Sequence, residues 1–362
     1  MSVNALPLQY ARTTDGVNIA FFSSGEGRPI VFASNIFGDA HLYGLGWPHV
    51  RCITDKLCAL GWRVLRHDHR GMGSSDRDVE DLRLDGRVRD LEAVVQVAGL
   101  PRFALVGTSI GAATAIAYAA RHPGMVSQLV LLSPFASGAE LFELPALRVA
   151  TAARVNDDHE WSVVANVLGS VSTSFGDQGL GRQIAEAIQQ GTSWSGLEAH
   201  QRASKEIALA GLLPHVRLPT LVIHEPAFPF GSFDQCRQVA AGIPGARLVI
   251  VGGRSIAGTA HDGHVAVIDR FLRAGRVDGY VSVDAGPTPD ARAVPDGLTH
   301  REVQVRQQLS AGLRNKEIAA TLGVAVPTIE RHLSNLYAKI GARGRADATA
   351  YALRHGLDSP GG

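Results

Sequence analysis

The residues best suited to covalent chemistry lie in the stretch LVGTSIGAATAIAYA, residues 105–119, where Ser109 stands between Gly107 and Gly111. The apolar run before Ser109 predicts a strand, and the small residues after it predict a helix. A serine on such a sharp turn projects its hydroxyl group away from the sheet, and the N–H of Ile110 would face a negatively charged oxygen. The spacing therefore predicts a nucleophile, with a turn that only shapes a binding pocket as the alternative.

A second group of candidate residues is basic and lies in the last part of the chain. Residues 298–357 contain nine lysines and arginines and four aspartates and glutamates, whereas residues 1–297 contain 26 and 29. A compact basic segment predicts a polyanionic partner, and a solvated charged face is the alternative.

Residues 1–274 alternate apolar, β-rich runs with segments of helical period. The runs are 17–22, 30–33, 63–67, 103–106, 128–132, 220–224 and 248–251. Continuous apolar strands separated by helix-length segments predict a parallel sheet covered by helices on both faces. Residues 135–214 are mostly helical in pattern, and we expect them to form a lid over the carboxyl ends of the strands, where such sheets bind ligands.

The strand, turn and helix around Ser109 resemble the nucleophile elbow of the α/β-hydrolase family. A second segment, VLRHDHRGMGSSD at residues 64–76, looks like that family's strand followed by an Asp-x-Arg-Gly-x-Gly-x-Ser loop. The resemblance covers residues 1–274 and implies an α/β fold, with a parallel-rich sheet and a helical lid. It also implies that a serine, a histidine base and a carboxylate would act together.

The family's catalytic carboxylate has no clear counterpart in this chain. In TLVIHEPAFPFGSFD, residues 220–234, ungapped alignment puts Ala227 and Phe228 where the acid belongs. Glu225 and Asp234 are the nearest carboxylates, and we expect Glu225 to be solvated. Because loss of the orienting carboxylate can lower the turnover of a triad enzyme about ten-thousandfold, the sequence predicts ligand binding rather than efficient turnover.

The family's histidine base and second oxyanion donor also match imperfectly. In GGRSIAGTAHDGH, residues 252–264, Ile256 stands at the nearest aligned position. His261 is the better candidate base, because His264 is expected to begin a helix, and an ordinary loop histidine is the alternative. Ile36 follows a Ser-Asn pair in place of the family's His-Gly pair, and its N–H is the candidate second donor beside that of Ile110. The H-x-x-H spacing lacks a nearby third ligand, so we predict neither a metal nor any other cofactor.

The segment from residue 298 onward reads as a group of short helices. Thr299 and Glu302 form a capping box for the first helix, NKEIAATLG predicts a second, and PTIERHLSNLYAKIG predicts a third. Two short helices joined by LGVAV constitute a helix-turn-helix. Over its whole length the segment resembles the LuxR-type (GerE-like) DNA-binding domain, which implies a small all-α fold and double-stranded DNA as the partner.

The resemblance implies that the helix from Val326 to Ile340 lies in the major groove. Helical spacing turns Glu330, Arg331 and Ser334 outward, where Arg331 would pair with guanine and Glu330 with a cytosine amine. Four further residues are placed for contacts with phosphate: Arg301, Lys316, Thr328 and Lys339. One such domain reads a short half-site, so the family implies a homodimer through a fourth helix at 345–357.

The residues 275–297 are rich in Gly, Pro and Asp, which predicts a linker between two domains at 1–274 and 298–358. No run of about 18 apolar residues is present, and the start is not signal-like, so we expect a cytoplasmic protein without a membrane partner. The sequence predicts a transcription regulator whose first domain senses a small molecule, ester-like or hydrophobic. The alternative is an active serine hydrolase, esterase-like, fused to a DNA-binding domain.

Overall fold

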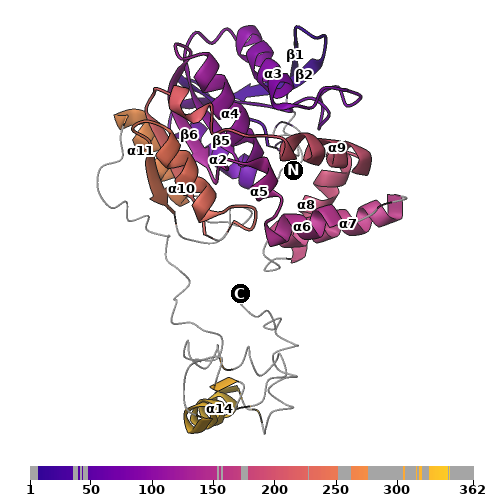
Figure 1. The fold of residues 1–362 in the computed structure, drawn as a ribbon, viewed down its shortest axis with the longest axis vertical. Helices are drawn as coiled ribbons and strands as arrows, with labels where there is room; N and C mark the ends of the chain where they lie inside the picture. Colours follow the sequence, from indigo (N-terminus) through magenta and orange to yellow (C-terminus); the bar gives the residue numbers. More distant parts are fainter. Residues whose placement is uncertain are drawn as a thin grey trace. The chain divides into compact units, whose positions relative to one another are not determined.

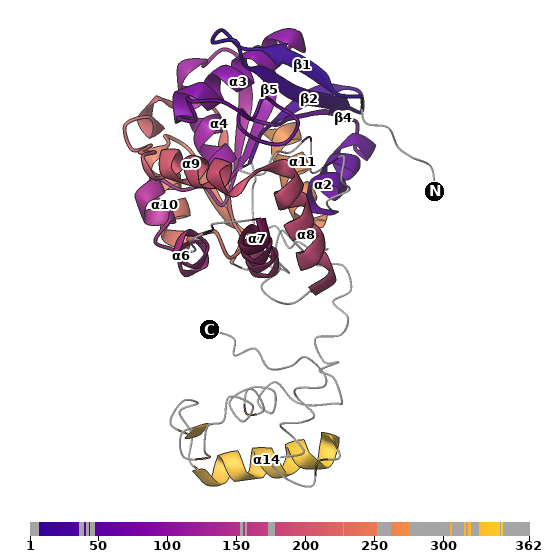
Figure 2. The same ribbon diagram turned by 90° about the vertical axis from the view of Figure 1, so that its right-hand side faces the viewer.

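The computed structural model divides into two compact units, residues 1–285 and 286–362. Figures 1 and 2 show the ribbon from two directions. The structure describes residues 7–35, 40, 43, 48–152, 155, 158–172, 178–226, 228–251, 262–275, 305, 315, 318–319, 326–340 and 342.

The described part of the first unit contains an eight-stranded sheet with helices on both faces, which confirms the predicted α/β class. In sheet order the strands are β1 (Gln9–Arg12), β2 (Asn18–Ser24), β4 (Trp62–His67), β3 (Arg28–Ala33), β5 (Phe103–Thr108), β6 (Val126–Leu132), β7 (Thr220–His224) and β8 (Arg247–Ile250). The six strands from β4 to β8 in this order are parallel. Their runs of buried apolar residues match that arrangement, because a parallel strand is covered on both sides.

One edge of the sheet departs from the parallel arrangement. β1 and β2 form an antiparallel hairpin, and β2 pairs antiparallel with β4. Gly16 in the hairpin turn has a φ of 88°, which glycine adopts without a steric penalty. Sequence reasoning missed β1 because only Ala11 of its four residues is buried, so its sequence carries no apolar run.

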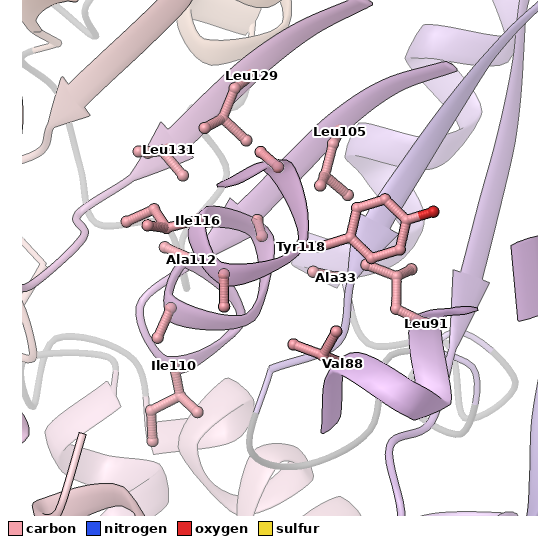
Figure 3. Packing of buried hydrophobic residues seen from close by; sticks show 14 of the residues in the cluster. Ala33, Val88, Leu91, Leu105, Ile110, Ala112, Ile116, Tyr118, Leu129 and Leu131 are labelled. Carbon is pink, nitrogen blue, oxygen red and sulfur yellow. The ribbon is translucent and has the colours of Figure 1, made fainter. Parts of the chain in front are cut away.

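Two apolar clusters flank the sheet. On one face lie α3 (Leu84–Val97), α4 (Ile110–Arg121) and α10 (Phe233–Gly242), and on the other lie α2 (Pro48–Ala59) and α11 (Asp262–Ala274). Figure 3 shows α4 between the strand residues Leu129 and Leu131 and the α3 residues Val88 and Leu91. The alanines of α4 let it approach the sheet closely, which fixes the position of the turn that precedes it.

The segment between β6 and β7, predicted to form a lid, is helical. Its described α-helices are α5 (Gly138–Leu141), α6 (Pro145–Ala152), α7 (Asp158–Ser172), α8 (Gln178–Gly191) and α9 (Trp194–Lys205). Helices α6, α7 and α8 lie at the end of the unit opposite β1 and β2 (Figures 1 and 2). Helices α7, α8 and α9 share a separate apolar cluster with Met72, which follows β4. The lid segment therefore has a small core of its own beside the carboxyl ends of the strands.

The described part of the second unit centres on α14 (Val326–Ile340). Ile329, Leu333 and Leu336 of α14 are buried and pack with Val305 and Ile318. No helix in the described ranges of either unit is long and apolar enough to cross a bilayer.

Candidate functional site

Ser109 occupies a strained turn between β5 and α4. Its φ of 48° and ψ of −113° lie in a region that residues with a side chain rarely adopt. Its N–H donates to the Leu132 carbonyl at 3.0 Å, and its carbonyl accepts from the Ala112 N–H at 3.0 Å. Ile110 is the first residue of α4, so no carbonyl of that helix can accept from its N–H. The turn thus places the Ser109 hydroxyl next to a helix N-terminus, where a negative charge is stabilised.

The two glycines of the motif are required by close backbone contacts. A Cβ on Gly111 would lie 2.3 Å from the Ala33 carbonyl oxygen of β3, and one on Gly107 would lie 2.6 Å from the Ala112 Cα. Both distances are shorter than any carbon can tolerate, and the neighbouring atoms are backbone atoms that cannot move aside. The glycines therefore allow α4 to fold back against the sheet directly after Ser109.

The residues that directly follow the parallel strands share one edge of the sheet. These residues are Ser34, Asp68, Ser109, Ser133, Glu225 and, after the edge strand β8, Val251. Ser133 also has a positive φ, 43°, and its N–H donates to the Ile223 carbonyl at 2.8 Å. Its hydroxyl group is buried and has no hydrogen-bond partner in the described part of the chain. Sequence reasoning missed Ser133, because Leu-Leu-Ser-Pro indicates the end of a strand and not a left-handed backbone.

The loop after β4 is held by ionic and backbone contacts. The Asp68 carboxylate accepts from the N–H groups of Ala40 and Ser74 at 2.7 and 2.9 Å. The buried Arg70 guanidinium pairs with Asp90 of α3 at 2.8 Å and with Asp15 at 2.7 Å. The hydrogen bond from Arg70 holds the pKa of Asp15 well below its usual range. The Asp-x-Arg-Gly loop therefore ties β4 to α3 at the carboxyl edge.

No described carboxylate hydrogen-bonds the Ser109 hydroxyl. Phe228, at one of the two predicted acid positions, contacts the Phe230 ring edge-on, and Ala227 lies outside the described residues. The expectation that Glu225 is solvated is wrong: it is 1% exposed, and its carboxylate lies 3.4 Å from the Nε2 of His264. Asp234 is exposed in the first turn of α10.

The burial of Glu225 has a tertiary cause. Glu225 directly follows β7, and His264 lies in the first turn of α11, so the start of α11 covers this end of the strand. The predicted helix is present, and it begins at Asp262, two residues before His264. The candidate base His261 and the candidate oxyanion donor Ile36 lie outside the described residues.

Helix α14 separates its predicted DNA-contacting residues from its buried ones. Glu330, Arg331, Ser334 and Lys339 are exposed, and Thr328 is half-buried. The remaining candidates for phosphate contact, Arg301 and Lys316, lie outside the described residues. The exposed face of α14 carries the residues expected to meet base edges, and its opposite face joins the small core.

Comparisons with known proteins assign both units. Residues 37–254 match the family model described as alpha/beta hydrolase fold, and residues 296–352 match that of bacterial regulatory proteins, luxR family. The AB hydrolase superfamily protein YisY of Bacillus subtilis is 28% identical over 252 residues, which cover 66% of this chain and 89% of that protein. The solved esterase RhEst1 of Rhodococcus sp. ECU1013 matches with a TM-score of 0.63 and 19% identity, over 74% of this chain and 98% of that one.

The second unit resembles regulators of transcription. The transcriptional regulatory protein LnrK of Bacillus subtilis is 42% identical over 60 residues, which cover 17% of this chain and 27% of that protein. The chain thus spans about a quarter of that regulator's length. The chain belongs to the α/β-hydrolase fold family and carries, at residues 296–352, a segment that matches the luxR family of bacterial regulatory proteins.

Proposed function

We propose that the hydrolase-fold domain binds a small molecule, ester-like or hydrophobic, and that binding changes the affinity of the chain for DNA. The observation that carries this proposal is the contrast around Ser109. The elbow is retained with its strained serine and both glycines, whereas Phe228 stands at the acid position and Glu225 pairs with His264. A retained elbow with an aromatic residue at the aligned acid position, and with Glu225 held by a histidine of α11, favours ligand binding over turnover.

The proposal for DNA follows from the exposed face of α14. Arg331 and Glu330 would read base edges, and Ser334 lies on the same face. Thr328, Lys339, Arg301 and Lys316 would contact phosphates and supply affinity with little sequence preference. A homodimer belongs to the proposal, because one such helix reads only a short half-site. A ligand then acts by binding one arrangement of the dimer more tightly than another.

The second candidate function is ester hydrolysis by Ser109, with His261 as the base. The positive φ of Ser109 favours this candidate, since backbone strain concentrates at functional sites. The two functions differ in turnover, which makes them separable by experiment.

The test uses the full-length protein with DNA selected by that protein from a random pool. DNA affinity is measured by fluorescence anisotropy with and without a panel of short-chain esters, and p-nitrophenyl ester hydrolysis is measured in parallel. We expect an ester to change DNA affinity while hydrolysis stays below about 1 per second, an ordinary enzyme rate. Ser109→Ala should alter the ligand response and leave DNA binding intact. Faster hydrolysis that disappears in both Ser109→Ala and His261→Ala would establish the hydrolase instead.

A further inference from the structure

Three basic side chains meet inside the first unit, between the lid segment and the sheet. His69 follows β4, Arg87 lies in α3 and His200 lies in α9, and each is at most 2% exposed. The rings of His69 and His200 have centroids 4.7 Å apart, and the Arg87 Nη2 lies 3.3 Å from the His200 Nδ1. We call these three residues the basic cluster.

The buried charge of Arg87 has only neutral acceptors among the described residues. Its Nε donates to the Leu82 carbonyl at 3.1 Å, and its Nη2 donates to the Ser204 hydroxyl at 2.9 Å. Asp90 is an acidic residue close enough to raise the pKa of Arg87, but its carboxylate accepts hydrogen bonds from the backbone N–H and the Nε of Arg70. Burial lowers the pKa of Arg87 to about 10. An arginine this deep ordinarily has an anionic partner, because an uncompensated buried charge costs several kcal/mol.

The cluster also has unused donors. The Arg87 Nη1 has no hydrogen-bond partner among the described residues, and the His200 Nε2, which carries the ring proton because Nδ1 accepts from Arg87, has no hydrogen bond of normal geometry there. The His69 Nδ1 lies 2.9 Å from the Arg70 carbonyl oxygen and carries the proton of that ring, which leaves the His69 Nε2 as an acceptor. A buried donor left without a partner is destabilising, which favours binding of an acceptor there. The described histidines, cysteines and acids form no group able to hold a metal ion. The two unused donors, on Arg87 and His200, suit an anion.

The charge of the cluster defines the anion. Burial lowers the pKa of His69 to about 3 and that of His200 well below its usual value, with the nearby Arg87 adding to both effects. Both imidazoles are therefore neutral at pH 7, and the cluster carries one positive charge. One charge with one neutral N–H donor, on His200, complements a monoanion such as a carboxylate.

The position of the cluster is that of a ligand site. His69 is two residues beyond the carboxyl end of β4, and ligands of open α/β sheets bind outside the carboxyl ends of strands. We propose that the basic cluster binds a carboxylate group of the ligand sensed by this domain, with Arg87 as the charged contact. This inference rests on the proposed sensing function and adds the chemical class of the ligand.

The cluster couples the ligand to helix α9. His200 and Ser204 of α9 occupy the Nη2 of Arg87 and cover the cluster, so a carboxylate reaches Arg87 only when α9 moves away. Helix α9 belongs to the apolar cluster that it forms with α7 and α8, and Met72 is the only described member of that cluster from outside the lid segment. A carboxylate on Arg87 replaces the contacts from α9 and thereby favours the arrangement with α9 displaced.

Titration calorimetry on the full-length protein tests this site with straight-chain carboxylates from acetate to octanoate, at constant ionic strength. Their methyl esters, inorganic phosphate and chloride serve as comparison ligands. We expect saturable binding of a carboxylate, with at least about tenfold weaker binding to its methyl ester and to Arg87→Gln, which corresponds to about 1.4 kcal/mol. Arg83→Gln is the matched control, because Arg83 precedes the same helix and its side chain is 73% exposed.

A second variant keeps the test decisive if Arg87→Gln fails to fold. Ser204→Ala removes a contact that holds α9 on Arg87 and leaves the guanidinium in place, so carboxylates should bind more tightly than to the wild type. Absence of carboxylate binding, equal binding to Arg87→Gln, or tighter binding of phosphate would overturn the assignment. An ester that changes DNA affinity while no carboxylate binds would overturn this inference and leave the sensing function standing. Carboxylate binding to the cluster without any change in DNA affinity would support the carboxylate site and overturn the sensing function.

Discussion

At the scale of single residues, the turn around Ser109 contains one residue with a strained backbone and two positions that only glycine can occupy. Ser109 adopts a backbone conformation that costs about 1–3 kcal/mol for a residue with a side chain. Gly107 and Gly111 carry no such strain but have no room for a Cβ. The turn therefore persists because packing of α4 on the sheet outweighs the strain at Ser109.

Replacing Ser109 by glycine should relieve this strain. We expect Ser109→Gly to raise the free energy of unfolding by about 1 kcal/mol relative to Ser109→Ala, because alanine keeps the Cβ and with it the penalty. Urea denaturation followed by tryptophan fluorescence measures the difference. Equal stability of the two variants would show that the positive φ is not strained.

Gly111→Ala should destabilise the first unit by about 1–3 kcal/mol, since its Cβ would collide with the Ala33 carbonyl oxygen. Gly124→Ala is the matched control, because a Cβ at Gly124 meets no atom within 4 Å. Denaturation midpoints compare the two variants. A loss at Gly124 as large as that at Gly111 would contradict the steric account.

At the scale of elements, α14 carries two faces with separate tasks. Ile329, Leu333 and Leu336 recur at three and four residues and anchor the helix, which leaves Arg331 and Ser334 on the exposed side. The buried residues hold the helix in the small core, and the exposed residues are free to contact DNA. Base reading and phosphate contact are therefore expected to respond differently to substitution.

Arg331→Ala should reduce the preference for a selected DNA site over random DNA by about 1–3 kcal/mol, because a bidentate contact to guanine is lost. Lys339→Ala should weaken binding to both DNAs by a similar factor and lower its salt dependence. Gel-shift titrations at two salt concentrations distinguish the two effects. Equal losses on selected and random DNA for Arg331→Ala would remove its assignment as a base reader.

At the scale of the whole molecule, the described part of the first unit buries several histidines, and His67, His69 and His200 are the most deeply buried of those that burial keeps neutral. Burial lowers the pKa of His67 to about 4 and that of His69 to about 3, and His200 is shifted in the same direction. The folded state then resists protonation over a pH range in which the unfolded chain accepts protons. Stability is therefore linked to pH through the interior of this unit.

The free energy of unfolding should fall as the pH drops from about 6.5 toward 4. Below the ordinary histidine pKa the unfolded state binds protons that the folded state excludes, which costs about 1.4 kcal/mol per pH unit for each such histidine. Urea denaturation at pH 7, 6 and 5 measures the slope, and His69→Gln should make it shallower. A flat profile would contradict the buried neutral state of these rings.

The proposed domain boundaries have their own test. Residues 275–297 are rich in Gly, Pro and Asp and carry few apolar side chains, so limited proteolysis should cut there first and release two fragments. Mass spectrometry of the fragments identifies the cleavage sites. First cuts within residues 135–214 would mean that the lid segment is more accessible to protease than the proposed linker.

Local sequence pattern was enough to predict the strands β2 to β8, the turn around Ser109 and helix α14. The seven predicted apolar runs correspond to β2 through β8, and the glycines around Ser109 and the amphipathic period of α14 indicated their structures. These features were readable because backbone sterics and helical or strand period act over a few residues. The pairing of Glu225 with His264 and the contacts among His69, Arg87 and His200 instead depend on long-range packing. Arg87 and His200 are 113 residues apart, and their contact depends on how the lid segment packs against the loop after β4, which no local period encodes.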